Sequence, residues 1–333
     1  MNDLAIVIPA YKAMFFDKTL ASLARQTDKR FNVYIGDDFS PFDLPRIIKK
    51  YEDKLTIYYE RFPNNIGAKN LVFQWKRCVE LTKQEKWLCL FSDDDIMDER
   101  CVENFYETVK KKEDAFDVYR FNTVTINKDD EVIIQSVAGP EIESAEQMAF
   151  HLLNGQRGNS MPDHIFSRNV YNKCGGFVFT EYAQGADWAS SILFAQDKGI
   201  CIIPDAKVHW RYSGTNISST ASGNSFMIKG HLQFLEWALK HFAYLSDGLS
   251  SISYAMMRDA LRMNLKIVLI NHYKGFQLSN TPLLVNFYRK QLKLSYYEAL
   301  KELIAIKRFP LQPVGKLRRL ASRIKNYFFF KKS

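Results

Sequence analysis

Short apolar runs alternate with amphipathic segments between residues 1 and 120. In the amphipathic segments the apolar residues recur at helical spacing, as Leu20, Leu23 and Ala24 do. Because strands separated by helices imply right-handed crossovers, this pattern predicts an α/β fold with a mostly parallel sheet flanked by helices. The expected strands are Leu4–Ile8, Phe31–Ile35, Leu55–Tyr59 and Trp87–Phe91, and the expected helices are Asp17–Gln26, Leu44–Tyr51, Ala68–Leu81 and Glu99–Lys111.

After Val118 the pattern becomes less regular, and the last third of the chain is mainly helical. A segment rich in Gly, Ser, Thr and Asn, Ser213–Asn224, is the expected domain boundary. We therefore expect a domain at 1–222, a helical C-terminal extension at 223–306 and a tail at 307–333. The elements expected here are strands Val118–Ile126, Glu131–Val137, Ile200–Pro204 and Val208–Tyr212, helices Ala145–Asn154 and Asp187–Gln196, and helices at 226–243, 250–270, 282–291 and 295–306.

Several classes of protein are disfavoured by what the sequence lacks. No GxGxxG follows the first strand, where Ile8–Lys12 stands, and no GxxxxGK[ST] occurs, which argues against dinucleotide and P-loop sites. The five cysteines form no CxxC pair, so reduced thiols in a cytosol are favoured over disulfides or zinc. We expect neither a signal peptide nor a membrane span, since the longest late apolar run, Ile267–Ile270, is far too short.

The positive charge of the chain is concentrated in its tail. Of 46 Lys and Arg, nine lie in 307–333 with no acid, which leaves 37 against 37 Asp and Glu elsewhere. Apolar residues recur there at helical spacing and end in Tyr327–Phe330, followed by Lys331 and Lys332. This pattern predicts a helix in an anionic membrane interface rather than a nucleic-acid surface. The alternative is an amphipathic helix docked on its own protein.

Three adjacent carboxylates, Asp93, Asp94 and Asp95, directly follow the strand expected at Trp87–Phe91. Ligands of open α/β sheets bind beyond the carboxyl ends of strands, and Mg²⁺ and Mn²⁺ prefer carboxylate and phosphate oxygens. The triplet therefore suggests a divalent cation site. The alternative is an acidic helix N-terminus with Ser92 or Asp93 as its cap.

Six short motifs follow one another along the first two thirds of the chain. They are Ile6–Tyr11, Ile35–Asp38, Asn65–Asn70, Ser92–Asp95, Gly175–Phe177 and Gly185–Trp188. In this order and spacing they resemble the family-2 glycosyltransferases, over residues 3 to 220. The resemblance implies a GT-A (Rossmann-like) fold and inverting, metal-dependent transfer from a nucleotide-sugar donor, with UDP as the expected nucleotide.

The resemblance also implies roles for residues near the donor. Asp38 matches the aspartate that accepts a hydrogen bond from the pyrimidine imide N–H, and Pro9 and Tyr11 match positions that line the base pocket. Turn chemistry and aromatic packing are the alternative for these two. Lys69 stands where the family often has an arginine near the nucleotide; the alternative is a solvated helix-face lysine. We expect Asp37 to cap the turn after its strand.

The acidic triplet and Asp187 resemble the catalytic positions of the family. The resemblance makes Asp95 the first metal ligand, Asp94 a contact to the ribose or sugar, and Asp93 either a metal ligand or a donor contact, with Mn²⁺ or Mg²⁺ as the cofactor. Ser92 stands where many members have Asp. Asp187 matches the catalytic base, although Ala186 replaces the neighbouring Glu; the alternative is an N-cap of its helix.

Two histidines are left with open roles. His209 lies in a segment, His209–Ser218, that resembles the one closing the family's active site, but Ser213 occupies the position where members often have His. A packed or hydrogen-bonded His209 is therefore as acceptable as a metal ligand. His164 could face the acceptor or be a solvated loop residue.

Together these features predict an inverting glycosyltransferase of bacterial surface polysaccharide synthesis, peripheral at the cytoplasmic membrane face. Its acceptor would be a saccharide or a lipid-linked saccharide, and no nucleic-acid partner is expected. The alternative is a catalytically inactive carbohydrate-binding or scaffold protein on the same fold, suggested by Ser92, Ala186 and Ser213.

Overall fold

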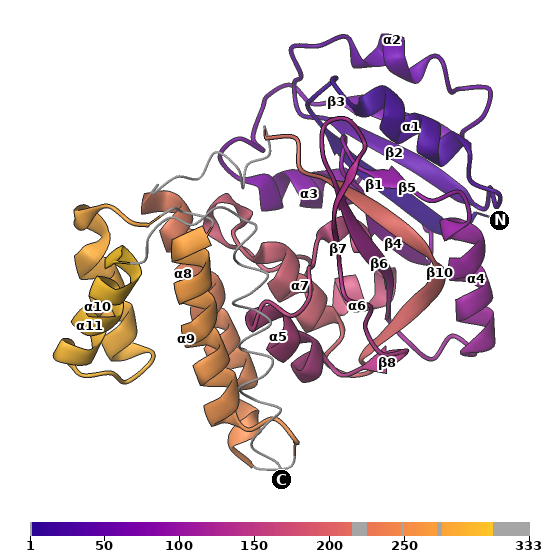
Figure 1. Cartoon of the computed structure of the whole chain (residues 1–333). Helices are drawn as coiled ribbons and strands as arrows, with labels where there is room; N and C mark the ends of the chain where they lie inside the picture. The colour runs from indigo at the N-terminus through magenta and orange to yellow at the C-terminus, as the bar shows by residue number, and fades with distance from the viewer. Residues whose placement is uncertain (1, 215–224, 248–249, 272–274, 309–333) are drawn as a thin grey trace. The chain divides into compact units, whose positions relative to one another are not determined.

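The computed structural model describes residues 2–214, 225–247, 250–271 and 275–308. These residues form two compact units, one from 2–149 with 157–214 and the other from 150–156 with the helices after residue 225 (Figure 1). The predicted membrane-interface helix falls in 309–333 and lies outside the described residues, as does most of the predicted boundary segment.

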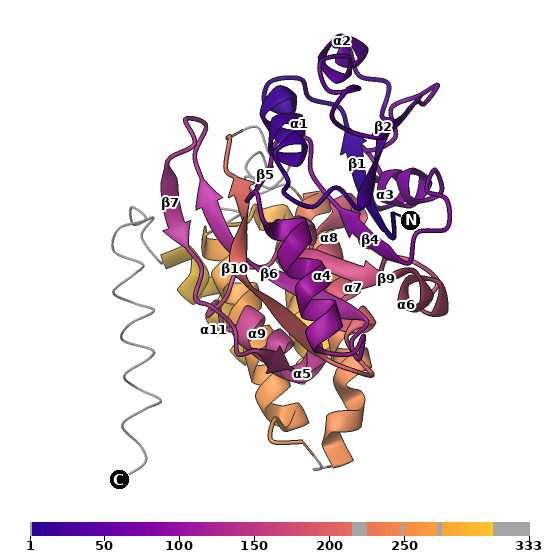
Figure 2. The ribbon, with the colours of Figure 1, turned by 90° about the vertical axis from the view of Figure 1, so that its right-hand side faces the viewer.

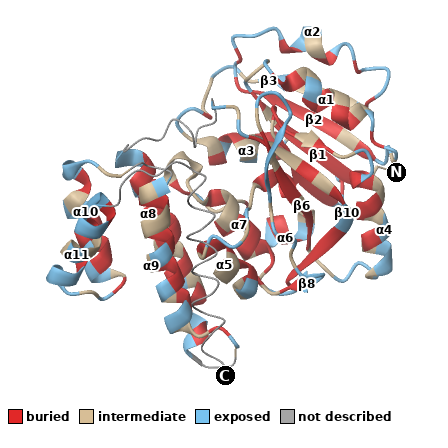
Figure 3. Ribbon diagram, viewed as in Figure 1, coloured by how far each residue is buried: buried red, intermediate tan, exposed pale blue. Residues whose placement is uncertain are grey.

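The first unit is built on four parallel strands that the apolar runs predicted. β1 (Leu4–Ala10) lies between β2 (Phe31–Asp37) and β4 (Trp87–Leu90), and β3 (Ile57–Arg61) pairs with β2. β1 is apolar along its whole length because both faces of the sheet are covered, as in other parallel sheets (Figure 3). The four carboxyl ends therefore meet at one edge of the sheet.

The rest of the sheet is mixed rather than parallel. β6 (Val118–Ile126) and β10 (Ile200–Arg211) are parallel to each other, and β9 (His164–Ser167) lies antiparallel between β4 and β6. The strand order is β3-β2-β1-β4-β9-β6-β10-β5. Short antiparallel strands complete it: β5 (Ile96–Met97) and β8 (Ile142–Glu143) on β10, and β7 (Val132–Gln135) on β6.

Two expectations about this second half were wrong. The sequence pattern indicates no strand at β9, because the run is only four residues long and both of its ends are polar. The pattern also predicts two strands, Ile200–Pro204 and Val208–Tyr212, where β10 is continuous. The apparent break is a bulge in the pairing with β6 between Ile203 and Lys207, where Asp205 has φ 54°.

Helices cover both faces of the sheet. One face packs on α1 (Phe16–Ala24), α2 (Leu44–Ile48) and α4 (Cys101–Lys111), whose apolar residues join one core with the strands (Figure 2). On the other face α3 (Leu71–Val79) packs on β1 and β2, and α6 (Arg168–Lys173) on β9. There Trp75, Tyr171 and Phe194 of α7 (Ala186–Phe194) form an aromatic cluster with Phe166 and Phe177.

The second unit is helical, as predicted for the C-terminal region. Its helices are α8 (Ser225–His241), α9 (Tyr254–Asn271), α10 (Thr281–Lys290) and α11 (Tyr296–Arg308). Inside it the His231 ring and Asn264 Oδ1 are 3.0 Å apart. Helix α5 (Ala145–Leu153) begins in the first unit and ends in the second. Within the described residues, no helix is long and apolar enough to cross a membrane.

Candidate active site

The loops that follow β1, β2 and β4 carry most of the predicted site residues, at the sheet edge where ligands of α/β folds bind. The first link between these loops is Asp93. Its Oδ2 accepts hydrogen bonds from the backbone N–H groups of Tyr11, at 2.8 Å, and Lys12, at 2.7 Å. The loop after β4 is therefore tied to the loop after β1.

The acidic triplet does not begin a helix. β5 follows it at Ile96, and the next helix, α4, begins at Cys101. The alternative in which Ser92 or Asp93 caps a helix is therefore wrong. All three carboxylates are buried. Three adjacent buried acids therefore need an explanation other than helix capping.

Lys12 forms an ion pair with one carboxylate of the triplet. Lys12 Nζ is 3.2 Å from Asp94 Oδ2. Burial, and then the charge of Asp94, raise the pKa of Asp93 to about 6, although Lys12 and the two N–H groups act in the other direction. Burial and Asp94 also raise the pKa of Asp95 well above its usual value. The carboxylates of this cluster would be stabilised by a further positive charge.

Asp95 is the best placed of the three to receive that charge. Its Oδ1 accepts a hydrogen bond from the N–H of Arg211 at 2.7 Å, and its carbonyl oxygen accepts one from Thr19 Oγ1 at 2.9 Å. Its Oδ2 is buried and accepts no hydrogen bond of ordinary geometry within the described part of the chain, although the Ser92 hydroxyl lies close enough to lower the pKa of this carboxyl group. A buried carboxylate oxygen without a donor suits a hard cation.

Arg211 holds the triplet to the other half of the sheet, and the sequence analysis gave it no role. Its side chain is fully buried. Its Nε donates to the carbonyl oxygen of Asp94 at 2.7 Å, and its Nη1 donates to that of Asn127 at 2.9 Å and lies 2.5 Å from Asp130 Oδ1. The available signal was one arginine inside a predicted strand, because a charge buried there needs partners.

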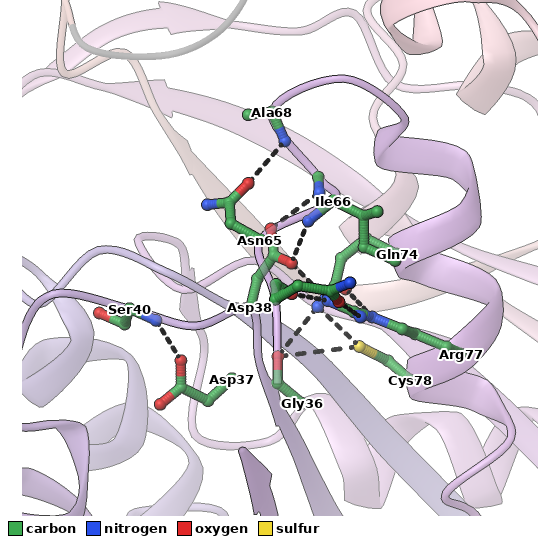
Figure 4. Close-up of polar contacts among 12 residues, drawn as sticks. Gly36, Asp37, Asp38, Ser40, Asn65, Ile66, Ala68, Gln74, Arg77 and Cys78 are labelled. Carbon is green, nitrogen blue, oxygen red and sulfur yellow. Dashed lines mark hydrogen bonds and ion pairs between the residues drawn. The ribbon is translucent and has the colours of Figure 1, made fainter. Parts of the chain in front are cut away.

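Asp38 lies at the end of β2 and is also strongly bound (Figure 4). Its carboxylate accepts hydrogen bonds from the N–H groups of Ile66, at 2.9 Å, and Gly67, at 2.8 Å, and forms an ion pair with Arg77 of α3. Burial raises the pKa of Asp38, and these partners limit the rise. Its neighbour Asp37 accepts a hydrogen bond from Ser40 N at 2.7 Å, which confirms the predicted turn.

The other residues predicted to bind the nucleotide-sugar donor are less buried than Asp38. Pro9 is half-buried in β1, opposite Gly36, and the Tyr11 side chain is exposed. Lys69 is exposed in the turn before α3. The cation that contacts Asp38 is Arg77 of α3 rather than Lys69, and the sequence indicated no role for Arg77.

Asp187 stands in the first turn of α7. Gly185, with φ 73°, is the N-cap of this helix, so the alternative that Asp187 is the N-cap is wrong. Burial raises the pKa of Asp187 to about 7, and the N–H groups of Trp188 and of Asp187 itself work against that rise. A carboxyl group that titrates near neutral pH is suited to general base catalysis.

Asp163, which the sequence analysis did not select, connects these two groups of acids. It ends η1 (Met161–Asp163), a 3₁₀ turn that packs on β4, β6, β10 and α7. Its negative charge raises the pKa of both Asp95 and Asp187, so both lie within its electrostatic reach. Asp163 is held by Ser160 in a capping box and lies 3.6 Å from Arg120.

Neither histidine is a solvated loop residue. His164 begins β9 and is buried, which corrects the expectation of a loop position; its Nδ1 is 2.9 Å from the carbonyl oxygen of Ser160. Burial, with the charge of Arg120, lowers its pKa to about 3, so the ring is neutral at pH 7. His209 Nε2 is 2.7 Å from Asp98 Oδ1, which confirms the hydrogen-bonded alternative.

Comparison with known proteins adds a family and a fold. The family model "Glycosyl transferase family 2" matches residues 5–173, just over half of the chain. The structure is similar to S. aureus TarS 1-349 in complex with UDP-GlcNAc, with a TM-score of 0.64 and 15% identity over 95% of this chain and 92% of that one. It is also similar to the same protein in complex with UDP, with a TM-score of 0.62, 14% identity, and 95% and 91% coverage. Identities this low show the fold alone.

One curated relative shares a short segment with the chain. Validoxylamine A glucosyltransferase of Streptomyces hygroscopicus subsp. jinggangensis (strain 5008) is 42% identical over 67 residues. The match covers 19% of this chain and only 16% of the relative.

Proposed function

The chain belongs to glycosyl transferase family 2, and from this premise we propose that it transfers a sugar from a UDP-sugar to a hydroxyl group, with inversion. The observation that carries the proposal is that Asp38 and Asp93 are both tied by hydrogen bonds to the carboxyl end of β1 and the loop after it, while η1, which carries Asp163, packs on β4 and on α7, the helix of Asp187. Such an arrangement joins a place for a charged donor to a base.

The donor would occupy the loops after β1 and β2. Asp38 would accept a hydrogen bond from the imide N–H of the base, and Pro9 and Tyr11 would border the base, with Lys69 near the phosphates. The choice of UDP is supported by the similar fold of TarS, which was solved with UDP-GlcNAc and with UDP.

Mn²⁺ or Mg²⁺ would be held by Asp95 and Asp93, with Asp94 near the ribose or sugar. The buried, unpartnered Oδ2 of Asp95 fits such a hard cation. Within the described residues no three His, Cys, Asp or Glu side chains form a ready metal site, so donor phosphates would complete the shell, as is usual for Mg²⁺. Bound there, the cation would stabilise charge on the departing diphosphate.

Asp187 would take the proton from the acceptor hydroxyl as that oxygen attacks the anomeric carbon. One base is enough for direct displacement, whereas a covalent route needs a second carboxylate as nucleophile. The acceptor would be a saccharide or lipid-linked saccharide in bacterial surface polysaccharide synthesis. The basic tail at 307–333 would hold the enzyme at the cytoplasmic face of the membrane.

The test is turnover of a panel of nucleotide sugars with Mn²⁺, measured as donor hydrolysis and as transfer to saccharide acceptors. We expect Asp187→Asn to lower kcat about 10²- to 10⁴-fold, the usual contribution of a general base. Asp197→Asn is the matched control, because Asp197 lies just after the same helix but pairs with Lys173 on the surface. No turnover with any donor would instead favour the inactive scaffold, and turnover that Asp187→Asn leaves unchanged would remove Asp187 as the base.

A further inference from the structure

Arg77 is an unusually constrained arginine for a helix that covers a sheet. Its side chain is only 11% exposed, and its guanidinium lies 3.8 Å from the centre of the Phe62 ring. In addition to the ion pair with Asp38, its Nη1 donates to Asn64 Oδ1 at 3.2 Å and its Nη2 to the carbonyl oxygen of Asn64 at 3.1 Å. One side chain thus holds the end of β2 and the loop after β3.

The Nε end of the Arg77 guanidinium is also held in place. Arg77 Nε is hydrogen bonded to Gln74, which is buried and donates to the carbonyl oxygen of Gly36 at 3.1 Å. The guanidinium therefore has a defined position and orientation relative to β2 (Figure 4). A flexible lysine could supply charge there but not the planar fork.

These contacts leave Asp38 with a single place for a ligand. A carboxylate offers about four acceptor positions. Among the residues that the structure describes, Oδ1 receives Ile66 N and Arg77, whereas Oδ2 receives only Gly67 N. A Cβ at position 67 would lie 2.6 Å from Oδ2, so a glycine is required for this approach. The position that remains is an acceptor at Oδ2.

We propose that Arg77 is a positioning residue for the nucleobase of the donor, because it holds Asp38 as a charged acceptor with one open position. Asp38 would then favour bases that present a ring N–H, namely uracil, thymine and guanine. Cytosine and adenine present an unprotonated ring nitrogen there and would be repelled by the carboxylate. This inference deepens the proposed function and rests on it.

The experiment is calorimetric titration of UDP, dTDP, GDP, CDP and ADP into the whole protein and its variants. We expect the wild type to bind UDP at least about tenfold more tightly than CDP, and Arg77→Gln to lose about tenfold in UDP affinity, the range of one charge-assisted hydrogen bond. Arg77→Lys should restore part of that loss. Arg30→Gln is the matched control, because Arg30 also pairs with an aspartate, Asp28, and stacks on a ring, Tyr106, at 4.0 Å, far from this loop.

A double-mutant cycle separates this role from a purely structural one. If Arg77 acts through Asp38, Arg77→Gln should change UDP affinity less than twofold in an Asp38→Asn background. Circular dichroism identifies variants that fail to fold; if Arg77→Gln is one, Arg77→Lys takes its place in the cycle.

The titrations distinguish failure of this inference from failure of the proposed function. A wild type that prefers dTDP or GDP removes UDP as the donor nucleotide but supports the inference if Arg77→Gln weakens that preference. A preference for CDP or ADP overturns the inference alone. A folded Arg77 variant with unchanged affinities also overturns it, and binding of none of the five nucleotides overturns both.

Discussion

The two halves of the central sheet place their acids in different ways. In the half made of β1 to β4, Asp38 and Asp93 stand in loops at strand ends and are held by backbone N–H groups of other loops. In the half made of β6, β9 and β10, Arg211 is buried in a strand and is held by carbonyl oxygens and by the side chain of Asp130. In the first half the preceding strand marks where each of these acids lies, although its partners are 28 to 82 residues away. In the second half Arg211 falls inside the predicted strand Val208–Tyr212, so no predicted strand end marks it.

Removing the side chain that joins the two halves should have the largest effect on stability. Arg211→Met would remove the side-chain donor to the carbonyl oxygens of Asp94 and Asn127, and would leave Asp130 with Lys18 as its cationic partner. Because Asp130 is partly exposed and keeps Lys18, we expect a loss of about 2 kcal/mol in the free energy of unfolding, from two lost hydrogen bonds of about 1 kcal/mol each.

Urea unfolding followed by circular dichroism measures this loss. Arg100→Met is the control, since Arg100 pairs with Glu103 on the surface and its loss should change the free energy of unfolding far less. If both variants were equally stable, Arg211 would not join the halves as described.

A smaller effect, a shift in the pH dependence of transfer, is expected from the charge of Asp163 acting on Asp187. Because Asp187 must be ionised to act as a base and its pKa is raised to about 7 by burial, kcat/KM should rise with pH up to about 7 and then level off. Asp163 contributes to that raised pKa. Asp163→Asn removes a negative charge, so the rising limb should move to lower pH.

The pH profile of transfer, measured for the wild type and Asp163→Asn, checks this sign. Asp197→Asn should leave the limb in place, and thermal unfolding shows whether Asp163→Asn is folded. A limb that stays fixed or moves to higher pH would mean that Asp163 and Asp187 are not coupled.

The smallest expected effect on catalysis comes from the tail. A chain that ends at Arg308 loses seven of the nine tail cations, together with Tyr327–Phe330. It should turn over a soluble acceptor like the full chain but should no longer float with anionic vesicles in a density gradient. Equal flotation of the two chains would refute the predicted membrane helix. Neutral vesicles serve as the control, since they lack the charge that attracts lysine and arginine.

The sequence was informative where structure is encoded by contiguous residues. The starts of β1, β2 and β4 were predicted correctly because each is an apolar run that ends in a turn. The loop positions of Asp38 and Asp93–Asp95 followed from those strands. The hydrogen bond of Asp37 to the next turn was predictable for the same reason.

The rest depended on contacts that no local pattern contains. β9 is too short and polar to stand out, and its insertion between β4 and β6 is what brings Asp163 to the site. Arg77 looks like any basic residue near the end of a helix until the fold brings Asp38 and Asn64 to it. Side chains of this kind become visible only when the topology is known.

If the acids of the first half hold a nucleotide diphosphate together with a divalent cation, the two ligands should bind cooperatively. Calorimetric titration of UDP with and without Mn²⁺, for the wild type and Asp95→Asn, measures this cooperativity. We predict that Mn²⁺ tightens UDP binding to the wild type at least about tenfold, which is about 1.4 kcal/mol, and that Asp95→Asn removes this gain. UDP binding that does not respond to Mn²⁺, or a full response in Asp95→Asn, would contradict the account.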